Sequence, residues 1–134
     1  MPRAHLPAPL TASIGGLAAL FLTSGAIHLV RPQVFEPIVP RPLGHARELV
    51  YVSGVAELAC AVGLLVPATR RRAGWASAAL LVAVLPANVQ MAVSAHRRAA
   101  RHPEDGKAQA LRWGTLARLP LQVPLIRVAL AATR

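Results

Sequence analysis

The sequence predicts an all-α integral membrane protein, a bundle of four transmembrane helices, and two observations indicate this class. First, 54% of the 134 residues are apolar and only 15% are charged, which is unusual for a soluble domain. Second, the apolar residues form four runs of about 20, the length that a helix needs to cross a hydrocarbon core of ~30 Å. These runs account for most of the chain, so we expect one membrane domain over residues 1–134.

The first apolar run predicts a helix over residues 10–30. This helix ends at Arg31, because Pro32 disfavours helical geometry in the residue before it. At about 21 residues the run exceeds the ~7 to 15 residues of a typical secretory signal core, so we expect a retained helix. Residues 33–46 follow with three prolines and one glycine, and they are expected to form a structured loop.

The second and third helices are predicted on either side of a short charged turn. Residues 47–66 form the second apolar run, which ends before Pro67. Three consecutive arginines at residues 70–72 make the turn. The third helix is expected over residues 73–95, with Trp75 at the level where an interfacial aromatic residue lies.

The last predicted helix is the least apolar of the four. Residues 96–112 are rich in charged side chains and are expected to form a polar loop. The fourth helix is predicted over residues 113–132, and it contains Arg118, Gln122 and Arg127. Arg127 is expected to extend toward the carboxyl end of the helix, where its charge reaches water and its role is structural.

The charge distribution favours a lipid partner over a nucleic acid. A net charge of +10 would indicate nucleic-acid binding in a soluble protein. Here the arginines stand at the ends of the apolar runs, where lipid headgroups lie, and aromatic residues make up only 4% of the chain, too few for stacking on bases. Only Lys107 among the 15 basic residues is a lysine, and with abundant alanine this indicates a GC-rich bacterial genome and hence the bacterial cell membrane.

Polar side chains inside the predicted spans are the candidate functional residues. An ionisable group there costs about 2.5 to 3.5 kcal/mol by insertion scales, so such residues are usually functional. Depth follows from a rise of ~1.5 Å per residue, counted from the helix ends that face the two longer loops. Five residues fall in the same half of the bilayer, and we expect them to line a polar pocket about 15 Å deep. They are His28, Glu57, Asn88, Arg118 and Gln122.

Within this predicted pocket, Glu57 is the only acid deep enough to need a cation, and Arg118 is the expected one. Arg118 and Gln122 are four residues apart and therefore share a helix face. Pro86 and Pro120 each precede an amide residue by two positions and are expected to kink their helices, which frees backbone carbonyls near the polar centre.

No metal site and no intrinsic cofactor are expected. His28 is the sole histidine within a predicted span, so a haem held by two intramembrane histidines is excluded by count, and a metal at His28 and Glu57 would lack further ligands. Cys60 is the only cysteine, which excludes an intramolecular disulfide and a C-x-x-C redox pair. A quinone remains as a candidate ligand of the predicted pocket.

Several stretches of the chain are similar to DoxX-like membrane proteins, a family of small bacterial proteins with four helices. They are YVSGVAEL with VGLLVPATRRRAGW, then LLVAVLPANVQMA, then ARLPLQVPLI. The resemblance spans Ser24 to Ile126, and its most specific parts are the motifs G-x-x-E at 54–57, P-x-N at 86–88 and R-x-P-x-Q at 118–122. It implies that Glu57, Asn88, Arg118 and Gln122 form the polar core of such a protein.

The resemblance implies only a modest statement about activity. The family takes its name from a subunit linked to thiosulfate and quinone redox chemistry, and other relatives look like accessory or assembly factors of redox or stress-response systems. The leading hypothesis is therefore a non-catalytic accessory or subunit protein of such a system. Its pocket would bind a quinone-like or other amphipathic molecule, and its partner would be a membrane redox complex or another subunit.

Three alternatives stay open at this point. In the first, the polar residues form a structural hydrogen-bond network between helices, made by Glu57, Asn88, Arg118 and Gln122. In the second the protein conducts protons or small solutes through Glu57, Arg118 and His28. In the third it is an enzyme that uses Glu57 as acid or base, although no activated nucleophile is evident in the sequence.

Overall fold

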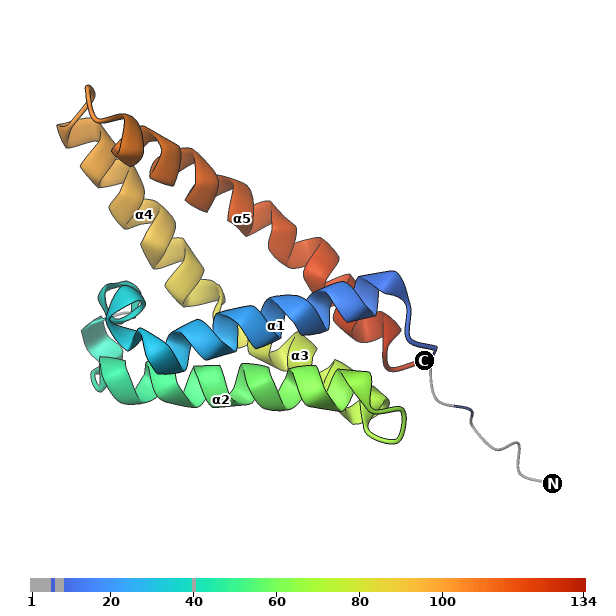
Figure 1. The fold of residues 1–134 in the computed structure, drawn as a ribbon. Helices are drawn as coiled ribbons and strands as arrows, with labels where there is room; N and C mark the ends of the chain where they lie inside the picture. The colour runs from blue at the N-terminus through green and yellow to red at the C-terminus, as the bar shows by residue number, and fades with distance from the viewer. Residues whose placement is uncertain (1–5, 7–8, 40) are drawn as a thin grey trace.

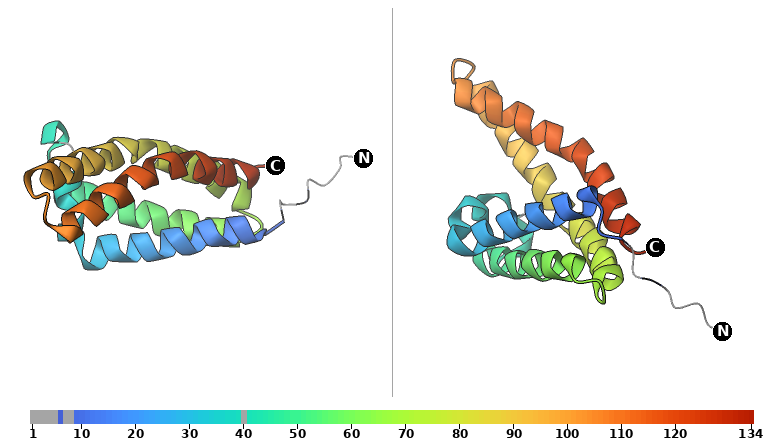
Figure 2. Two further views of the ribbon diagram at one scale, coloured as in Figure 1. Left: turned by 90° about the horizontal axis from the view of Figure 1, so that it is seen from above. Right: turned by 45° about the vertical axis from the view of Figure 1, so that its right-hand side comes forward.

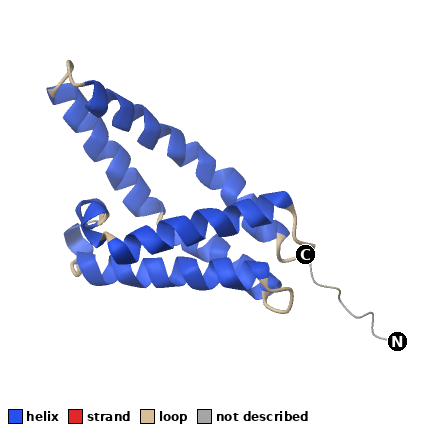
Figure 3. Ribbon diagram, viewed as in Figure 1, coloured by secondary structure: helices blue, strands red, loops and turns tan. Residues whose placement is uncertain are grey.

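The computed structural model describes residues 6, 9–39 and 41–134, and all regular structure within these residues is helical (Figure 3). The predicted all-α class is therefore confirmed. In chain order the elements are α1 (Ala12–Val30), η1 (Pro32–Val34), η2 (Glu36–Ile38), η3 (Arg41–Leu43), α2 (Ala46–Leu65), α3 (Arg70–Ala83), α4 (Leu85–Arg101) and α5 (Gly106–Ala131). The elements η1 to η3 are short 3-10 helices, and the others are α-helices.

The helices form two antiparallel hairpins that meet through α3. Helices α1 and α2 pack along their length, and α3 folds back from the end of α2 to contact α5 as well (Figure 1). Helices α4 and α5 make the second hairpin, which leans away from α1 and α2, as the right-hand view of Figure 2 also shows. The bundle is therefore tightly packed at the end that holds the α2–α3 turn and more open at the other.

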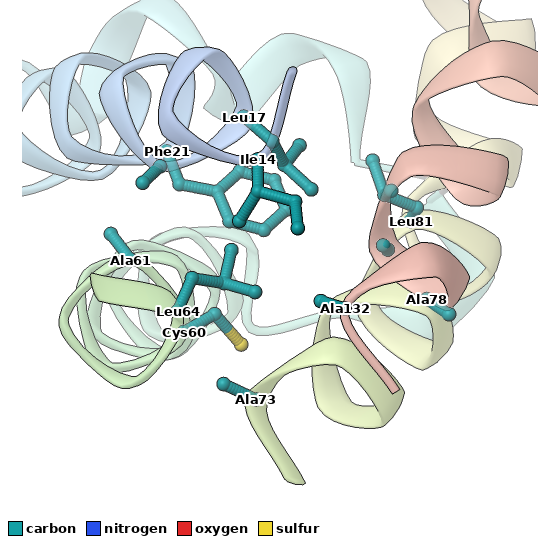
Figure 4. Packing of buried hydrophobic residues seen from close by; sticks show 12 residues of the cluster. Ile14, Leu17, Phe21, Cys60, Ala61, Leu64, Ala73, Ala78, Leu81 and Ala132 are labelled. Carbon is teal, nitrogen blue, oxygen red and sulfur yellow. The ribbon is translucent and has the colours of Figure 1, made fainter. Parts of the chain in front are cut away.

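The apolar core lies at the tightly packed end. Ile14, Leu17 and Phe21 of α1 meet Leu64 of α2 and Leu81 of α3, together with small residues of α5 (Figure 4). Most of the other core positions are alanine, and such small side chains allow the helices to approach closely. Along α1 the core residues from Ile14 to Phe21 stand roughly 21 to 10 Å from His28 at ~1.5 Å per residue, so the core lies toward the other end of this helix.

The third predicted helix, over residues 73–95, is longer than expected and is interrupted. It corresponds to α3 and α4, which are separated at Val84. Pro86 stands in the first turn of α4, where its missing N–H is harmless, so the chain starts a new helix there. By contrast Pro120 and Pro124 both lie inside the continuous helix α5.

The prediction of a polar loop over residues 96–112 is wrong. Helix α4 continues to Arg101, and α5 begins at Gly106 instead of residue 113. Alanine, arginine, lysine and glutamine are all good helix formers, and polarity alone does not end a helix. The turn is set by a cap: the Asp105 carboxylate accepts hydrogen bonds from the backbone N–H groups of Lys107 at 3.0 Å and Ala108 at 3.3 Å.

We expect Asp105→Ala to destabilise the protein by about 1 kcal/mol, because the first backbone N–H groups of α5 lose their acceptor. The measurement is the midpoint of thermal unfolding in mild detergent. Glu104→Ala is the matched control, since Glu104 is the exposed neighbouring acid and holds no cap. Equal shifts in the two variants would contradict the capping role.

Three helical stretches of the described chain are long and apolar enough to cross a membrane. They are Ala12–Val30, Ala46–Leu65 and the stretch Arg70–Arg101, which comprises α3 and α4. Helix α5 does not meet this criterion, although a fourth span was predicted there. Large apolar side chains also point outward: Val52 and Val55 of α2 are 66% and 56% exposed. Lipid would cover such side chains.

Candidate functional site

The candidate site is built on a close crossing of α1 and α2, where Gly25 faces Gly54. A Cβ atom at Gly54 would lie 2.7 Å from the Cβ of His28 and 3.0 Å from the carbonyl oxygen of Gly25. A Cβ atom at Gly25 would lie 2.8 Å from the carbonyl oxygen of Gly54. Only glycine allows the two backbones to approach this closely. The crossing presses together the helix faces that carry His28 and Glu57.

The geometry around His28 defines which ring nitrogen carries the proton. Its Nδ1 atom lies 2.6 Å from the carbonyl oxygen of Ser24, and a carbonyl oxygen only accepts hydrogen bonds. Nδ1 therefore donates. In the neutral imidazole the other nitrogen, Nε2, must then present a lone pair. Phe35 stacks on the ring, with centroids 3.8 Å apart and planes 12° from parallel, and so fixes the orientation of the imidazole.

Glu57 lies beside this imidazole and is incompletely satisfied. Its Oε2 atom is 3.6 Å from Nδ1 of His28, an ion-pair distance that is too long for a hydrogen bond. The same oxygen is buried and has no hydrogen-bond partner. A buried acceptor without a donor is costly and often marks a site that takes up a proton or a ligand.

The predicted ion pair between Glu57 and Arg118 is wrong. Arg118 is exposed on α5, and within the described residues the ion-pair partner of Glu57 is His28. The physical reason is the lean of the second hairpin, which carries α5 away from α2 over this part of its length (Figure 1). Arg118 has the expected depth in the sequence, but its helix is not packed against Glu57.

The two amides of the predicted pocket do not join the His28–Glu57 pair. Asn88 is half-buried on α4, and Gln122 is buried on α5 with its Oε1 atom lacking a hydrogen-bond partner. No hydrogen bond connects either amide to His28, Glu57 or Arg118 among the described residues, so the alternative of a single hydrogen-bond network is not seen. Ligand binding by these five residues stays a prediction.

Ser24 and Phe35 belong to the site but had not been predicted as site residues. A signal for Ser24 is present in the sequence: the pattern S-G-x-x-H-L at residues 24–29 is matched by S-G-x-x-E-L at residues 53–58. The paired glycines form the crossing, and the residue three positions later supplies each titratable group. Phe35 stands in the loop after α1, and no such pattern marks it.

These observations define a small all-helical protein with three helices long and apolar enough to cross a membrane and a buried His–Glu pair. The chain belongs to the family described as domain of unknown function DUF8561, which it matches over residues 17–133. Neither a curated protein nor a solved structure matches the chain.

The family match overturns the resemblance to DoxX-like proteins. It covers nearly all of the helices on which that resemblance was based and assigns them to a different family. The physical reason for the error is that short motifs of glycine, proline and a polar residue serve general needs of helices in lipid. Glycine allows close packing, and proline is tolerated where neighbouring groups satisfy the freed carbonyl. Such motifs indicate helix packing and do not identify one family.

Proposed function

We propose that this protein is an integral membrane protein of the bacterial cell membrane with four crossings, the fourth made by α5. The three apolar stretches and their outward-facing valines support insertion. Helix α5 is long enough for a fourth crossing, since its 26 residues span about 39 Å at ~1.5 Å per residue. Arg112 and Arg127 lie nearer its two ends and can extend along the helix toward the headgroups, whereas Arg118 stands near its middle.

We further propose that the protein is a non-catalytic accessory protein that binds a quinol-like amphipathic molecule at the His28–Glu57 pair. The observation that carries this proposal is the buried Glu57 Oε2 without a donor, beside an imidazole that keeps an accepting Nε2. A hydroxyl group of the ligand would donate to Nε2. The Glu57 carboxyl group, 3.6 Å from Nδ1, would polarise the neutral imidazole and so make Nε2 a stronger acceptor.

The position of His28 suits an amphipathic ligand. It stands in the last turn of α1, close to the boundary of the span, and is 8% exposed. The head of the ligand would therefore lie near the membrane surface while its tail follows the apolar outer faces of α1 and α2. A protein that binds a quinol would serve a membrane enzyme that oxidises or reduces it, so a membrane redox complex is the proposed partner.

The geometry favours this ligand-binding role over the two other active roles. A serine–histidine–acid relay needs serine and acid on opposite ring nitrogens, whereas Ser24 Oγ, at 3.4 Å, and Glu57 both approach Nδ1. A proton conductor that uses Arg118 as a relay member lacks contact between Arg118 and Glu57. The proton conductor remains the second candidate, because a buried titratable pair is also what a proton relay needs.

The test measures, by fluorescence or calorimetry, how tightly a short-chain ubiquinol binds to the detergent-purified protein. We expect His28→Ala to weaken binding about two- to tenfold, because one hydrogen bond between neutral groups contributes about 0.5 to 1.5 kcal/mol. Glu57→Gln should weaken it less, since the imidazole remains. His96→Ala, which removes an exposed histidine of α4, is the control and should bind as the wild type does.

Two outcomes would contradict the proposal. Unchanged ubiquinol binding in His28→Ala would place the ligand elsewhere or show that binding is non-specific partitioning. Proton flux in proteoliposomes that disappears in Glu57→Gln, with no ubiquinol binding in the wild type, would favour the proton conductor.

A further inference from the structure

A cluster of cationic side chains at the end of α4 is not used by the His28–Glu57 site. Ser94, Arg97, Arg98, Arg101 and His102 line one open pocket of about 450 Å³, which we call the basic pocket. Ser94, Arg97, Arg98 and Arg101 follow the spacing of residues on a single helix face. All five residues are exposed, so an anion would reach them from outside.

The positive charge of the basic pocket is not neutralised by the protein. Within the described residues, the recorded ion pairs are His28 with Glu57 and Arg47 with Glu36, and neither involves this pocket. The nearest acids in the sequence are Glu104 and Asp105. The Asp105 carboxylate caps α5, and Glu104 makes no ion pair with the arginines.

Three guanidinium groups within two helical turns repel one another in the absence of an anion, and such like-charge pairs are unfavourable on a helix. Arginine also presents a planar fork of donors that matches the oxygens of phosphate. Arg97 and Arg101 are four residues apart, so their side chains lie one above the other along the helix. Together with the Ser94 hydroxyl, they form a donor set suited to a single phosphate group.

The basic pocket also has the position of a headgroup site. It lies at the carboxyl end of the Arg70–Arg101 stretch, whose other end carries the arginines at residues 70–72. Immediately before it, Val89 and Val93 of α4 are 43% and 39% exposed and would face lipid tails. Cationic side chains that directly follow exposed apolar ones on one helix match the boundary between acyl chains and phosphates.

We propose that the basic pocket binds the phosphate of an anionic phospholipid of the bilayer, with Arg97 and Arg101 as the principal ligands. This inference depends on the proposed membrane insertion but not on the proposed quinol site. Phosphatidylglycerol is a suitable probe, because it carries one phosphate and a net negative charge, whereas phosphatidylcholine carries the same phosphate with no net charge.

The test reconstitutes the full chain into phosphatidylcholine vesicles that contain a minor fraction of phosphatidylglycerol, and native mass spectrometry then measures which lipids stay bound. We expect wild-type protein to retain phosphatidylglycerol far above its fraction in the vesicle. Arg97→Gln with Arg101→Gln should reduce this enrichment by about thirtyfold, roughly fivefold per arginine near a membrane surface. The matched control is Arg71→Gln with Arg72→Gln, which removes the same charge from exposed positions at the other end of the stretch.

The outcomes separate a pocket from general surface charge. An unchanged enrichment in the control, with loss in the Arg97 and Arg101 variant, supports the proposal. Equal losses in both variants would overturn it, because the lipid would then respond to net charge alone. Vesicle flotation is measured first: wild-type protein that does not float with the vesicles would overturn the membrane proposal itself, whereas floating protein without enrichment overturns only the basic pocket.

Discussion

Gly54→Ala is expected to destabilise the protein by about 1 to 3 kcal/mol, the usual cost of forcing an extra carbon into a packed interface. The added Cβ would lie 2.7 Å from the Cβ of His28 and 3.0 Å from the backbone oxygen of Gly25. Neither neighbour is the far end of a flexible side chain, so α1 and α2 must separate. The measurement is the midpoint of thermal unfolding in mild detergent.

The control for this variant is expected to have the opposite sign. Gly16 lies in α1 as well, but a Cβ atom added there would meet nothing within 4 Å. Because alanine is favoured over glycine inside a helix by roughly 0.5 to 1 kcal/mol, Gly16→Ala should leave stability unchanged or raise it. A comparable decrease in both variants would show that glycine is needed for a reason other than the crossing at Gly54.

The substitution Gly54→Ala should also disturb the candidate site. Moving the backbone of α1 away from α2 increases the 3.6 Å distance between His28 Nδ1 and Glu57 Oε2. Ubiquinol binding should therefore weaken in Gly54→Ala at temperatures where the variant is still folded, and it should not weaken in Gly16→Ala. Stability and binding are thus linked through one backbone contact.

The helices were largely predictable from the sequence, whereas their ends were not. Predicted ranges 10–30 and 47–66 correspond closely to α1 and α2, because an apolar run of membrane length is a strong signal. The start of α5 depends on a local cap, the Asp105 carboxylate, and not on where apolar residues stop. Hydropathy carries no information about such a cap, so the polar segment was wrongly expected to be a loop.

For the candidate site, the sequence predicted how far along each helix the residues lie, but not which helix faces meet. Counting residues from the helix ends placed His28 and Glu57 in the same half of the predicted spans, and the structure brings these two side chains together. Arg118 satisfied the same count and is exposed, since depth says nothing about how far one helix leans from another. The repeated S-G-x-x-(H/E)-L pattern contains the missing information, because paired glycines determine which helix faces touch.

Arg70→Ala is expected to cause the largest loss of stability, about 3 kcal/mol or more. Three consecutive arginines follow α2, yet Arg70 alone among them is buried, with 4% of its surface exposed. Its Nε donates to the carbonyl oxygen of Leu64 at 2.6 Å, and its Nη2 donates to that of Leu65 at 3.0 Å. These carbonyls are in the last turn of α2, where no intrahelical N–H reaches them.

Removing the guanidinium would therefore leave two backbone acceptors unsatisfied at the tightly packed end of the bundle, where the apolar core lies. The cation also interacts favourably with the negative end of the helix dipole, which adds to the loss. Arg70→Lys should recover only part of the stability, because an ammonium group does not reproduce the planar fork that reaches both oxygens.

Arg71→Ala is the matched control for this prediction. It removes the same charge one residue away from an exposed side chain, and such surface changes usually alter stability by less than about 0.5 kcal/mol. Thermal unfolding in detergent should therefore separate Arg70→Ala from Arg71→Ala by several degrees. If both variants unfold at the wild-type temperature, the hydrogen bonds from Arg70 do not stabilise the turn between α2 and α3. Packing, such as that of Gly63 against Ala73, must then stabilise this turn.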